Sequence, residues 1–334
     1  MKQAKTLADI AKLAGVAEST VSRALKNSPL ISAATKQKVM AIASEHNFHI
    51  DVRAQNFKMG KSQTIAVIIN LNPTSGQVLS DPFLLGLVGC IADEVATKGY
   101  DLLFSTMRDF SARQALSYLA GRKADGLLIV GQGADPTALD YMADQGVPFV
   151  VWGQLCRPSR YVTVGSDNHK GAYLATRHLL EQGRSNLLFL GDTNHIEIAA
   201  RYQGFQQALA ERQLDASHSM HASAAFCMQS GFEQTQRILA DNKPLDGIVC
   251  SSDLIAFGCI NAITAAGKKT PSDIAVTGYD NILMAEYFAP ALTTVAQDIK
   301  TGAQHMVSSL MAMIDGGQGQ SLQLEPALVV REST

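Results

Sequence analysis

The greater part of the chain alternates short apolar runs with segments in which apolar residues recur every four positions. The first series contains TIAVIINL, YDLLFST, GLLIV and PFVVWG, and the segment after its first run has apolar residues at Phe83, Leu87, Ile91 and Val95. A second series begins near residue 162 and contains VTVG, NLLFLG, GIVCS and IAVTGYD. Continuous apolar runs between helical segments are typical of buried parallel strands. We therefore predict an α/β fold with two doubly wound lobes and a ligand cleft at the carboxyl ends of their strands.

The first sixty residues have a different pattern, with three short helical segments. Thr6 and Asp9 have the spacing of a capping box, and Gly15 suits a left-handed helix end. A second helix is expected at about 17–26, and Ser32 caps a third. Two short helices joined by a tight turn and closed by a third predict a helix-turn-helix head, whose second helix enters the DNA major groove. A plain three-helix bundle with one solvated face is the alternative.

The second helix carries short polar side chains and one cation, at Glu18, Ser19, Thr20, Ser22 and Arg23. Hydroxyl groups at a helix start can contact phosphates and bases, and an arginine can reach a phosphate or a guanine. The first 61 residues hold ten Lys/Arg and four Asp/Glu, whereas the rest of the chain holds 18 and 26. A basic head on an acidic body is expected where the head alone meets a polyanion.

The stretch TLADIAKLAGVAESTVSRALKNSPLISAATKQKVMAIASEHNF resembles the DNA-binding head of the lactose/galactose repressor family of bacterial transcription regulators. The resemblance implies that Glu18 and Ser19 read bases. It also implies phosphate or base contacts, which involve Thr6, Ala17, Thr20, Ser22, Arg23 and Asn27. The family commonly has Ser where this chain has Ala17, so one capping hydroxyl, worth about 1 kcal/mol, is absent.

Residues 50–62 correspond to the family's hinge, which becomes helical on the operator and inserts a Leu into the minor groove. Arg53 and Gln55 fit that pattern, and Phe57 stands where the Leu is usual. Phenylalanine is an accepted wedge for unstacking a base step. Insertion of Phe57 is therefore one hypothesis, and packing of Phe57 on the body is the other.

The body resembles the effector-binding core of the same family, which is akin to periplasmic sugar-binding proteins. The matching stretches include GSDNHKGAYLATRHLLEQG, ARYQGFQQAL, DGIVCSSDLIAFG, AVTGYDN and LTTVAQD. The expected domains are a head (1–49), a hinge (50–62) and an effector-binding and dimerisation core (63–334). Lobe one is expected at about 63–162 and 293–321, and lobe two at about 163–292 and 322–334. Because the chain stops at VVREST without the heptad helix of family tetramers, a homodimer is expected.

The resemblance implies an effector cleft, to which the following residues are assigned: Asp81, Phe83, Trp152, His195, Arg201, Phe226, Ser252 and Asp280. A carboxylate and a guanidinium make directional hydrogen bonds to hydroxyl groups, and aromatic faces cover apolar ligand faces. The alternatives are that Phe83 and Phe226 are plain core and that Arg201 is a structural ion-pair partner. Ser252 replaces a common Asn, which puts its contact in doubt.

The sequence contains none of the common nucleotide, hydrolase or metalloprotease motifs, and HSMH (218–221) offers too few ligands for a metal site. The five cysteines form no CxxC pair, and no secretory or membrane segment is present. We expect no enzyme activity, no cofactor and no metal. The predicted function is a cytoplasmic, nucleoid-associated repressor that binds a pseudo-palindromic duplex operator and responds to a saccharide. An α-glucoside is one candidate saccharide, and a purine or nucleoside is another effector class. A sugar-binding solute-binding protein is the alternative.

Overall fold

The computed structural model describes residues 6–48, 61–71, 76–133, 137–156, 158–214 and 219–334. The chain divides into two units, 1–62 and 63–334, which are described separately below. Most of the expected hinge, including Arg53, Gln55 and Phe57, lies outside the described residues.

The head contains three helices, α1 (Leu7–Ala14), α2 (Glu18–Leu25) and α3 (Ala33–Glu45). The predicted capping box at the start of α1 is confirmed, because the Thr6 hydroxyl accepts from the Asp9 N–H at 3.1 Å and Asp9 Oδ2 accepts from the Thr6 N–H at 3.0 Å. Fully buried Ile10, Val21 and Val39, one from each helix, meet in the head's core. This small apolar core holds α2 against the other two helices.

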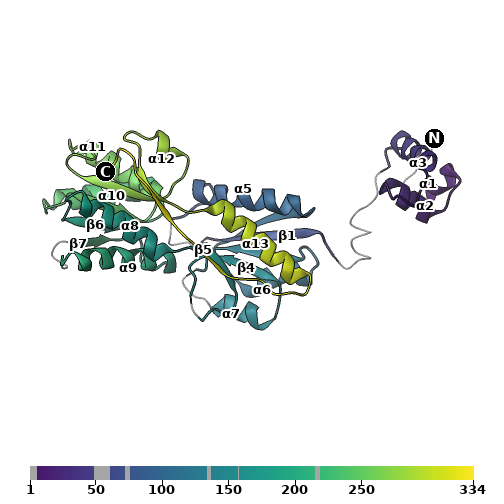
Figure 1. Ribbon diagram of the computed structural model, residues 1–334, viewed down its shortest axis with the longest axis horizontal. Coiled ribbons are helices and arrows are strands. Elements are labelled where there is room, and N and C mark those ends of the chain that lie inside the picture. The colour runs from purple at the N-terminus through teal and green to yellow at the C-terminus, as the bar shows by residue number, and fades with distance from the viewer. Residues whose placement is uncertain (1–5, 49–60, 72–75, 134–136, 157, 215–218) are drawn as a thin grey trace. The chain divides into compact units, whose positions relative to one another are not determined.

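The core is built on two six-stranded sheets (Figure 1). The first sheet has the order β11-β5-β4-β3-β1-β2, and its paired strands all run parallel. Its strands are β1 (Thr64–Asn70), β2 (Asp101–Met107), β3 (Gly126–Val130), β4 (Phe149–Trp152), β5 (Val162–Ser166) and β11 (Leu322–Leu324). Alternate residues of β1 enter separate apolar clusters on the two faces of the sheet, which explains why this strand is apolar throughout.

The second sheet has the order β12-β10-β9-β8-β6-β7, and β12 alone of its described strands is antiparallel to its neighbour. Its strands are β6 (Leu187–Leu190), β7 (Ser219–Ala222), β8 (Gly247–Cys250), β9 (Ala275–Asp280), β10 (Thr293–Ala296) and β12 (Ala327–Val329). In each sheet one strand, β1 or β6, pairs with its successor on one side and with the next strand on the other. Such reversals of strand order open a crevice at the carboxyl ends of the strands.

Helices cover both faces of each sheet (Figure 1). On the first sheet, α5 (Pro82–Thr97) and α13 (Ile299–Ile314) pack together on one face, with α6 (Ala112–Ala120) and α7 (Thr137–Asp144) on the other. On the second sheet, α8 (Asn168–Glu181) pairs with α9 (Ile196–Glu211), and α10 (Met228–Ala240) pairs with α11 (Asp253–Ala265). The short α12 (Met284–Tyr287) follows β9. The predicted α/β fold with two doubly wound lobes is thus confirmed.

The chain passes between the lobes three times, after β5, after β10 and after β11. The expected crossings near 163, 292 and 322 are therefore a few residues too early. Residues 162–166 pair with β4 in the first sheet, 293–296 pair with β9 in the second, and 322–324 return to pair with β5. An apolar run reveals that a strand is buried but not which sheet supplies its hydrogen-bond partner.

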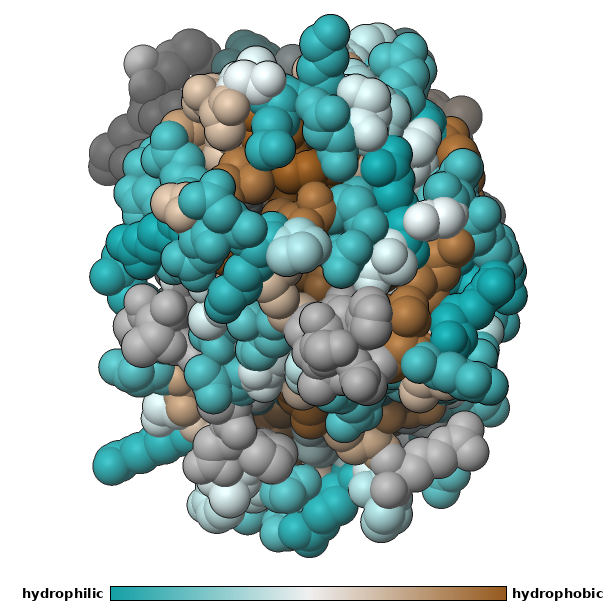
Figure 2. Space-filling model, turned by 90° about the vertical axis from the view of Figure 1, so that its left-hand side faces the viewer, coloured by the Kyte–Doolittle hydropathy of each residue, from teal (hydrophilic) through white to brown (hydrophobic). Residues whose placement is uncertain are grey.

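The face of the core seen in Figure 2 is mainly hydrophilic, with smaller groups of apolar side chains between the polar ones. In the described part of the chain, no helix has both the length and the apolar character needed to cross a membrane.

Candidate functional site

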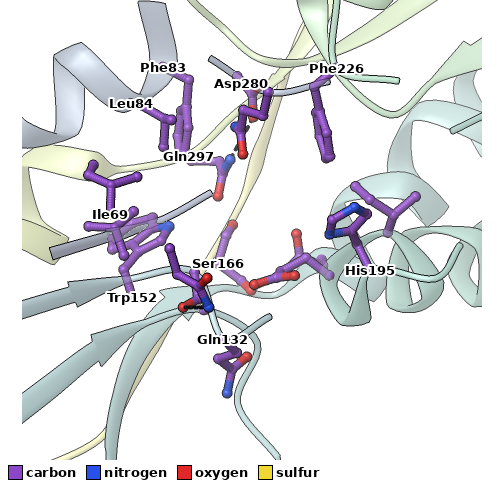
Figure 3. A pocket seen from close by; sticks show the side chains of 18 of the residues that line it. Ile69, Phe83, Leu84, Gln132, Trp152, Ser166, His195, Phe226, Asp280 and Gln297 are labelled. Atoms are coloured by element: carbon purple, nitrogen blue, oxygen red, sulfur yellow. Dashed lines mark hydrogen bonds between the residues drawn. The ribbon is translucent and has the colours of Figure 1, made fainter. Parts of the chain in front are cut away.

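A cavity lies at the carboxyl ends of the strands of both lobes, with about 830 Å³ of empty space that is partly open to solvent (Figure 3). Lobe one contributes residues that end β1, β3, β4 and β5, and lobe two contributes the start of α9 and the end of β9. The cavity therefore lies where the doubly wound topology predicts a ligand crevice.

Two pairs of aromatic side chains line separate sides of this cavity (Figure 3). Phe83, at the start of α5, lies beside Trp152, at the end of β4, with ring centroids 6.3 Å apart and planes tilted by 53°. Across the cavity, His195 and Phe226 make an edge-on contact at 5.5 Å. These ring faces form apolar surfaces suited to the apolar faces of a small ligand.

Arg201 of α9 lines the cavity, although only 6% of its surface is exposed. Its Nε donates to Asn168 Oδ1 at 2.8 Å, and its Nη1 donates to the Ser251 carbonyl oxygen. The guanidinium carbon lies 3.6 Å from the centroid of the Tyr279 ring, which is a close cation–π contact. These contacts hold the guanidinium in one orientation against the cavity.

Asp280, the last residue of β9, faces Arg201, with 4.0 Å between Asp280 Oδ1 and Arg201 Nη1. The same carboxylate oxygen accepts from Gln297 Nε2 at 2.8 Å (Figure 3). Asp280 has φ of 116°, a conformation that is strained for any residue but glycine and is found most often at functional sites.

Burial raises the pKa of Asp280 well above its ordinary value; the nearby Arg201 cation opposes this rise, and Asp253 and Asp81 add to it. Burial likewise raises the pKa of Asp253 to about 7, although the Thr294 hydroxyl and the Ile282 N–H both donate to its carboxylate. Asp280 thus faces the Arg201 guanidinium, and Asp253 and Asp81 lie close enough to Asp280 to raise its pKa further.

Six of the eight expected effector residues line the cavity together: Phe83, Trp152, His195, Arg201, Phe226 and Asp280. Asp81 and Ser252 do not line it. Asp81 accepts from the Phe83 N–H at 2.9 Å and from Gln77 Nε2 at 3.1 Å, and thereby caps α5. Ser252 accepts from the Ile255 N–H at 3.3 Å and caps α11. Both side chains are engaged in starting a helix beside the cavity.

Most of the polar lining was not predicted from the sequence; it includes Asn70, Gln77, Gln132, Asn168, Glu197 and Gln297. Several of these lie at or just after a strand end: Gln297 directly follows β10, and Gln132 is the second residue after β3. The rule that ligands bind at the carboxyl ends of parallel strands could have identified them. A side-chain amide both donates and accepts hydrogen bonds, which makes it a suitable partner for a hydroxyl group.

On the head, α2 buries Val21 and Ala24 and leaves Glu18, Ser19 and Arg23 exposed. Ala17 is the N-cap and supplies no side-chain hydrogen bond, as expected. Thr20 and Ser22 are half-buried. The exposed residues share one helix face and are free to meet an external partner.

Two expected DNA contacts have structural partners within the head. The Thr6 hydroxyl oxygen caps α1. Asn27 follows α2 with φ of 54°, and its Oδ1 accepts from Lys36 Nζ of α3 at 2.9 Å. These bonds fix the two ends of the α1–α2 segment.

A helix-turn-helix head together with a two-lobed core around a polar cavity defines a ligand-responsive DNA-binding regulator. Residues 6–51 match the family described as bacterial regulatory proteins, lacI family, and residues 176–334 match the periplasmic binding protein-like domain. The chain thus joins a lacI-family DNA-binding domain to a periplasmic-binding-protein-like core, as in the transcriptional regulators to which it is similar.

Similar proteins match over nearly the whole chain. The HTH-type transcriptional repressor PurR of Haemophilus influenzae is 28% identical over 98% of both chains. The crystal structure of the Lac repressor dimer bound to operator and the anti-inducer ONPF has a TM-score of 0.87 at 25% identity, covering 98% of each chain. The transcriptional regulator CelR–cellobiose complex has a TM-score of 0.72 at 28% identity, covering 98% of this chain and 99% of that one.

Proposed function

We propose that this protein is a cytoplasmic, nucleoid-associated repressor that binds a pseudo-palindromic DNA operator as a homodimer and changes its operator affinity when a saccharide occupies the core cavity. The observation that carries the proposal is the cavity's set of donors and acceptors. The fixed Arg201 guanidinium and the Asp280 carboxyl lie among side-chain amides and between aromatic faces. Vicinal hydroxyl groups on a ring with apolar faces match this arrangement.

The exposed face of α2 supports the DNA part of the proposal. Ser19 and Arg23 can donate to base edges or phosphates, and Glu18 can accept from cytosine N4. The Lac repressor relative is a dimer bound to operator, and two copies of the head on a two-fold axis would meet two half-sites of a palindrome.

Homodimerisation is supported by apolar side chains that the single chain leaves in solvent. Leu283 is 76% exposed and Tyr287 is 74% exposed, at either end of α12, and Met284 between them is 47% exposed. A second copy of the chain that covers these residues would remove the cost of hydrating them.

A saccharide effector is supported by the cellobiose bound to the CelR relative as well as by the cavity. The proposed α-glucoside rests on the resemblance of PFVVWG, YVTVGSDN and LLFLGD to family members that respond to such sugars. A purine or nucleoside is the other effector class, and the experiment has to distinguish a response to it from a response to a sugar.

Operator selection from a random DNA duplex library tests the proposal, followed by anisotropy titrations at one fixed salt concentration, because phosphate contacts make affinity salt-dependent. We expect a palindrome to be enriched and its affinity to change with a sugar but not with purines or nucleosides. Glu18→Ala should alter the base preference, whereas Arg237→Ala, on the exposed side of α10, should leave it unchanged. Recovery of no preferred sequence, or a response to purines alone, would contradict the proposal.

A further inference from the structure

Glu197 lines the cavity, but it has no role in the family resemblance or in the pairing of Arg201 with Asp280. It lies in the first turn of α9, two residues after the N-cap His195, and both residues line the cavity. Its side chain is half-buried, and among the described residues no basic group forms an ion pair with it. Glu197 therefore brings an uncompensated carboxylate to the cavity wall.

The start of α9 would otherwise be a place for an anionic ligand. Unpaired N–H groups and the helix dipole give a helix N-terminus a partial positive charge that attracts carboxylates and phosphates. Glu197 occupies the first turn and supplies that negative charge from the protein itself.

The other charged residues of the cavity lining, Arg201 and Asp280, do not make a site for an anionic ligand either. Arg201 is the only lysine or arginine among the lining residues described, and it already contacts Asn168, the Ser251 carbonyl oxygen and the Tyr279 ring. Asp280 already faces this guanidinium, and Asp81 and Asp253 lie close enough to Asp280 to interact with it. Glu197 is thus the lining carboxylate that faces no cation among the described lining residues, because Asp280 already faces Arg201.

From this arrangement we infer that the cavity selects an uncharged saccharide over its anionic counterparts, and that Glu197 is the residue that discriminates between them. Uronates and sugar phosphates would bring a second negative charge against the half-buried Glu197 carboxylate in the cavity wall. Two like charges separated by several ångströms in a partly buried site repel strongly enough to reduce affinity by about tenfold or more. The inference rests on the proposed saccharide response and narrows it to neutral sugars.

Calorimetric titration of the full-length protein with matched pairs of sugars tests the inference. The pairs are glucose with glucuronate and glucose 6-phosphate, galactose with galacturonate, and maltose, cellobiose and sucrose each with its 6-phosphate. We expect at least one neutral sugar to bind and its anionic counterpart to bind about tenfold more weakly or worse. An anionic sugar that binds as tightly as its neutral counterpart, or more tightly, would overturn the inference and leave the proposed saccharide response standing. Failure of every sugar both to bind and to change operator affinity would overturn both.

The variant Glu197→Gln tests whether Glu197 causes the preference for neutral over anionic sugars. It should raise the affinity for the anionic sugar relative to the neutral one, because the start of α9 regains its positive potential. Glu211→Gln, at the other end of α9 and outside the cavity lining, is the matched control and should leave the ratio of affinities unchanged. An unchanged ratio in Glu197→Gln would show that Glu197 does not discriminate, whatever the absolute affinities become.

Discussion

Replacement of Arg201 by methionine tests whether its charge is matched to Asp280, because methionine keeps much of the side-chain volume and removes the cation. Both partners are nearly buried, with side-chain exposures of 7% and 11%. Removal of one partner of a buried pair costs about 3–5 kcal/mol, since the other is left as an uncompensated charge. Protonation of Asp280 limits the loss, because burial already raises the pKa of this carboxyl. We therefore expect a free energy of unfolding that is lower by about 3 kcal/mol, which corresponds to a fall in Tm of about 6–12 °C.

Urea and thermal unfolding of the full-length variant at pH 7 measure this loss. Asp280→Asn in the same chain should restore at least about 1 kcal/mol, because the amide leaves no charge to neutralise. The loss should also be smaller at acidic pH. Without Arg201 the pKa of Asp280 rises further, so the folded state holds its proton and gains stability as the pH falls. A loss below about 1 kcal/mol, or the absence of rescue by Asp280→Asn, would refute the pairing.

Three further predictions concern other parts of the chain. Ala17→Ser supplies the missing N-cap hydroxyl of α2 and should stabilise the head by about 0.5–1 kcal/mol, seen as slower amide exchange at Val21; unchanged exchange would contradict the capping argument. Burial raises the pKa of Asp253 to about 7, so the folded state binds a proton that the unfolded chain releases, and stability should fall as the pH rises towards 7. The variant Asp253→Asn should flatten this slope in urea unfolding, and a slope equal to that of the wild type would remove Asp253 as its cause. Phe57→Ala should reduce the bend of operator DNA if the side chain inserts, and an equal bend angle would exclude insertion.

Much of the fold could be predicted because local chemistry determines it. The Thr6–Asp9 spacing specifies a capping box whatever surrounds it, and that box is present. The apolar runs predicted buried strands, and β1 is indeed buried on both faces. The three lobe crossings could not be located as well, because periodicity contains no information about which sheet a strand joins. β5 is the clearest case, since it begins the second series in sequence and yet pairs with β4.

The candidate site was predictable where a residue combines charge or an aromatic ring with a recognisable motif, as for Arg201 and Asp280. Neutral amides such as Gln132 belong to no recognisable motif, and only their position after the end of a strand identifies them as candidate lining residues. Asp81 and Ser252 were expected in the cavity from the family resemblance, Ser252 because it stands where the family commonly has Asn. Their helices begin at those positions, and an unsatisfied helix start requires the same side-chain oxygen that a ligand would use.

The central claim is that binding of the operator by the head is coupled to binding of a sugar in the core cavity. The most direct test is whether each ligand changes the affinity for the other by the same factor. Operator affinity is measured with and without saturating sugar, and sugar affinity is measured with and without saturating operator, at the same salt concentration. Thermodynamic linkage requires the two ratios of dissociation constants to be equal. We predict equal ratios that differ from one and that return to one in Arg201→Met. Ratios of one in the wild-type protein would contradict the account, because the cavity and the DNA-binding head would then act independently.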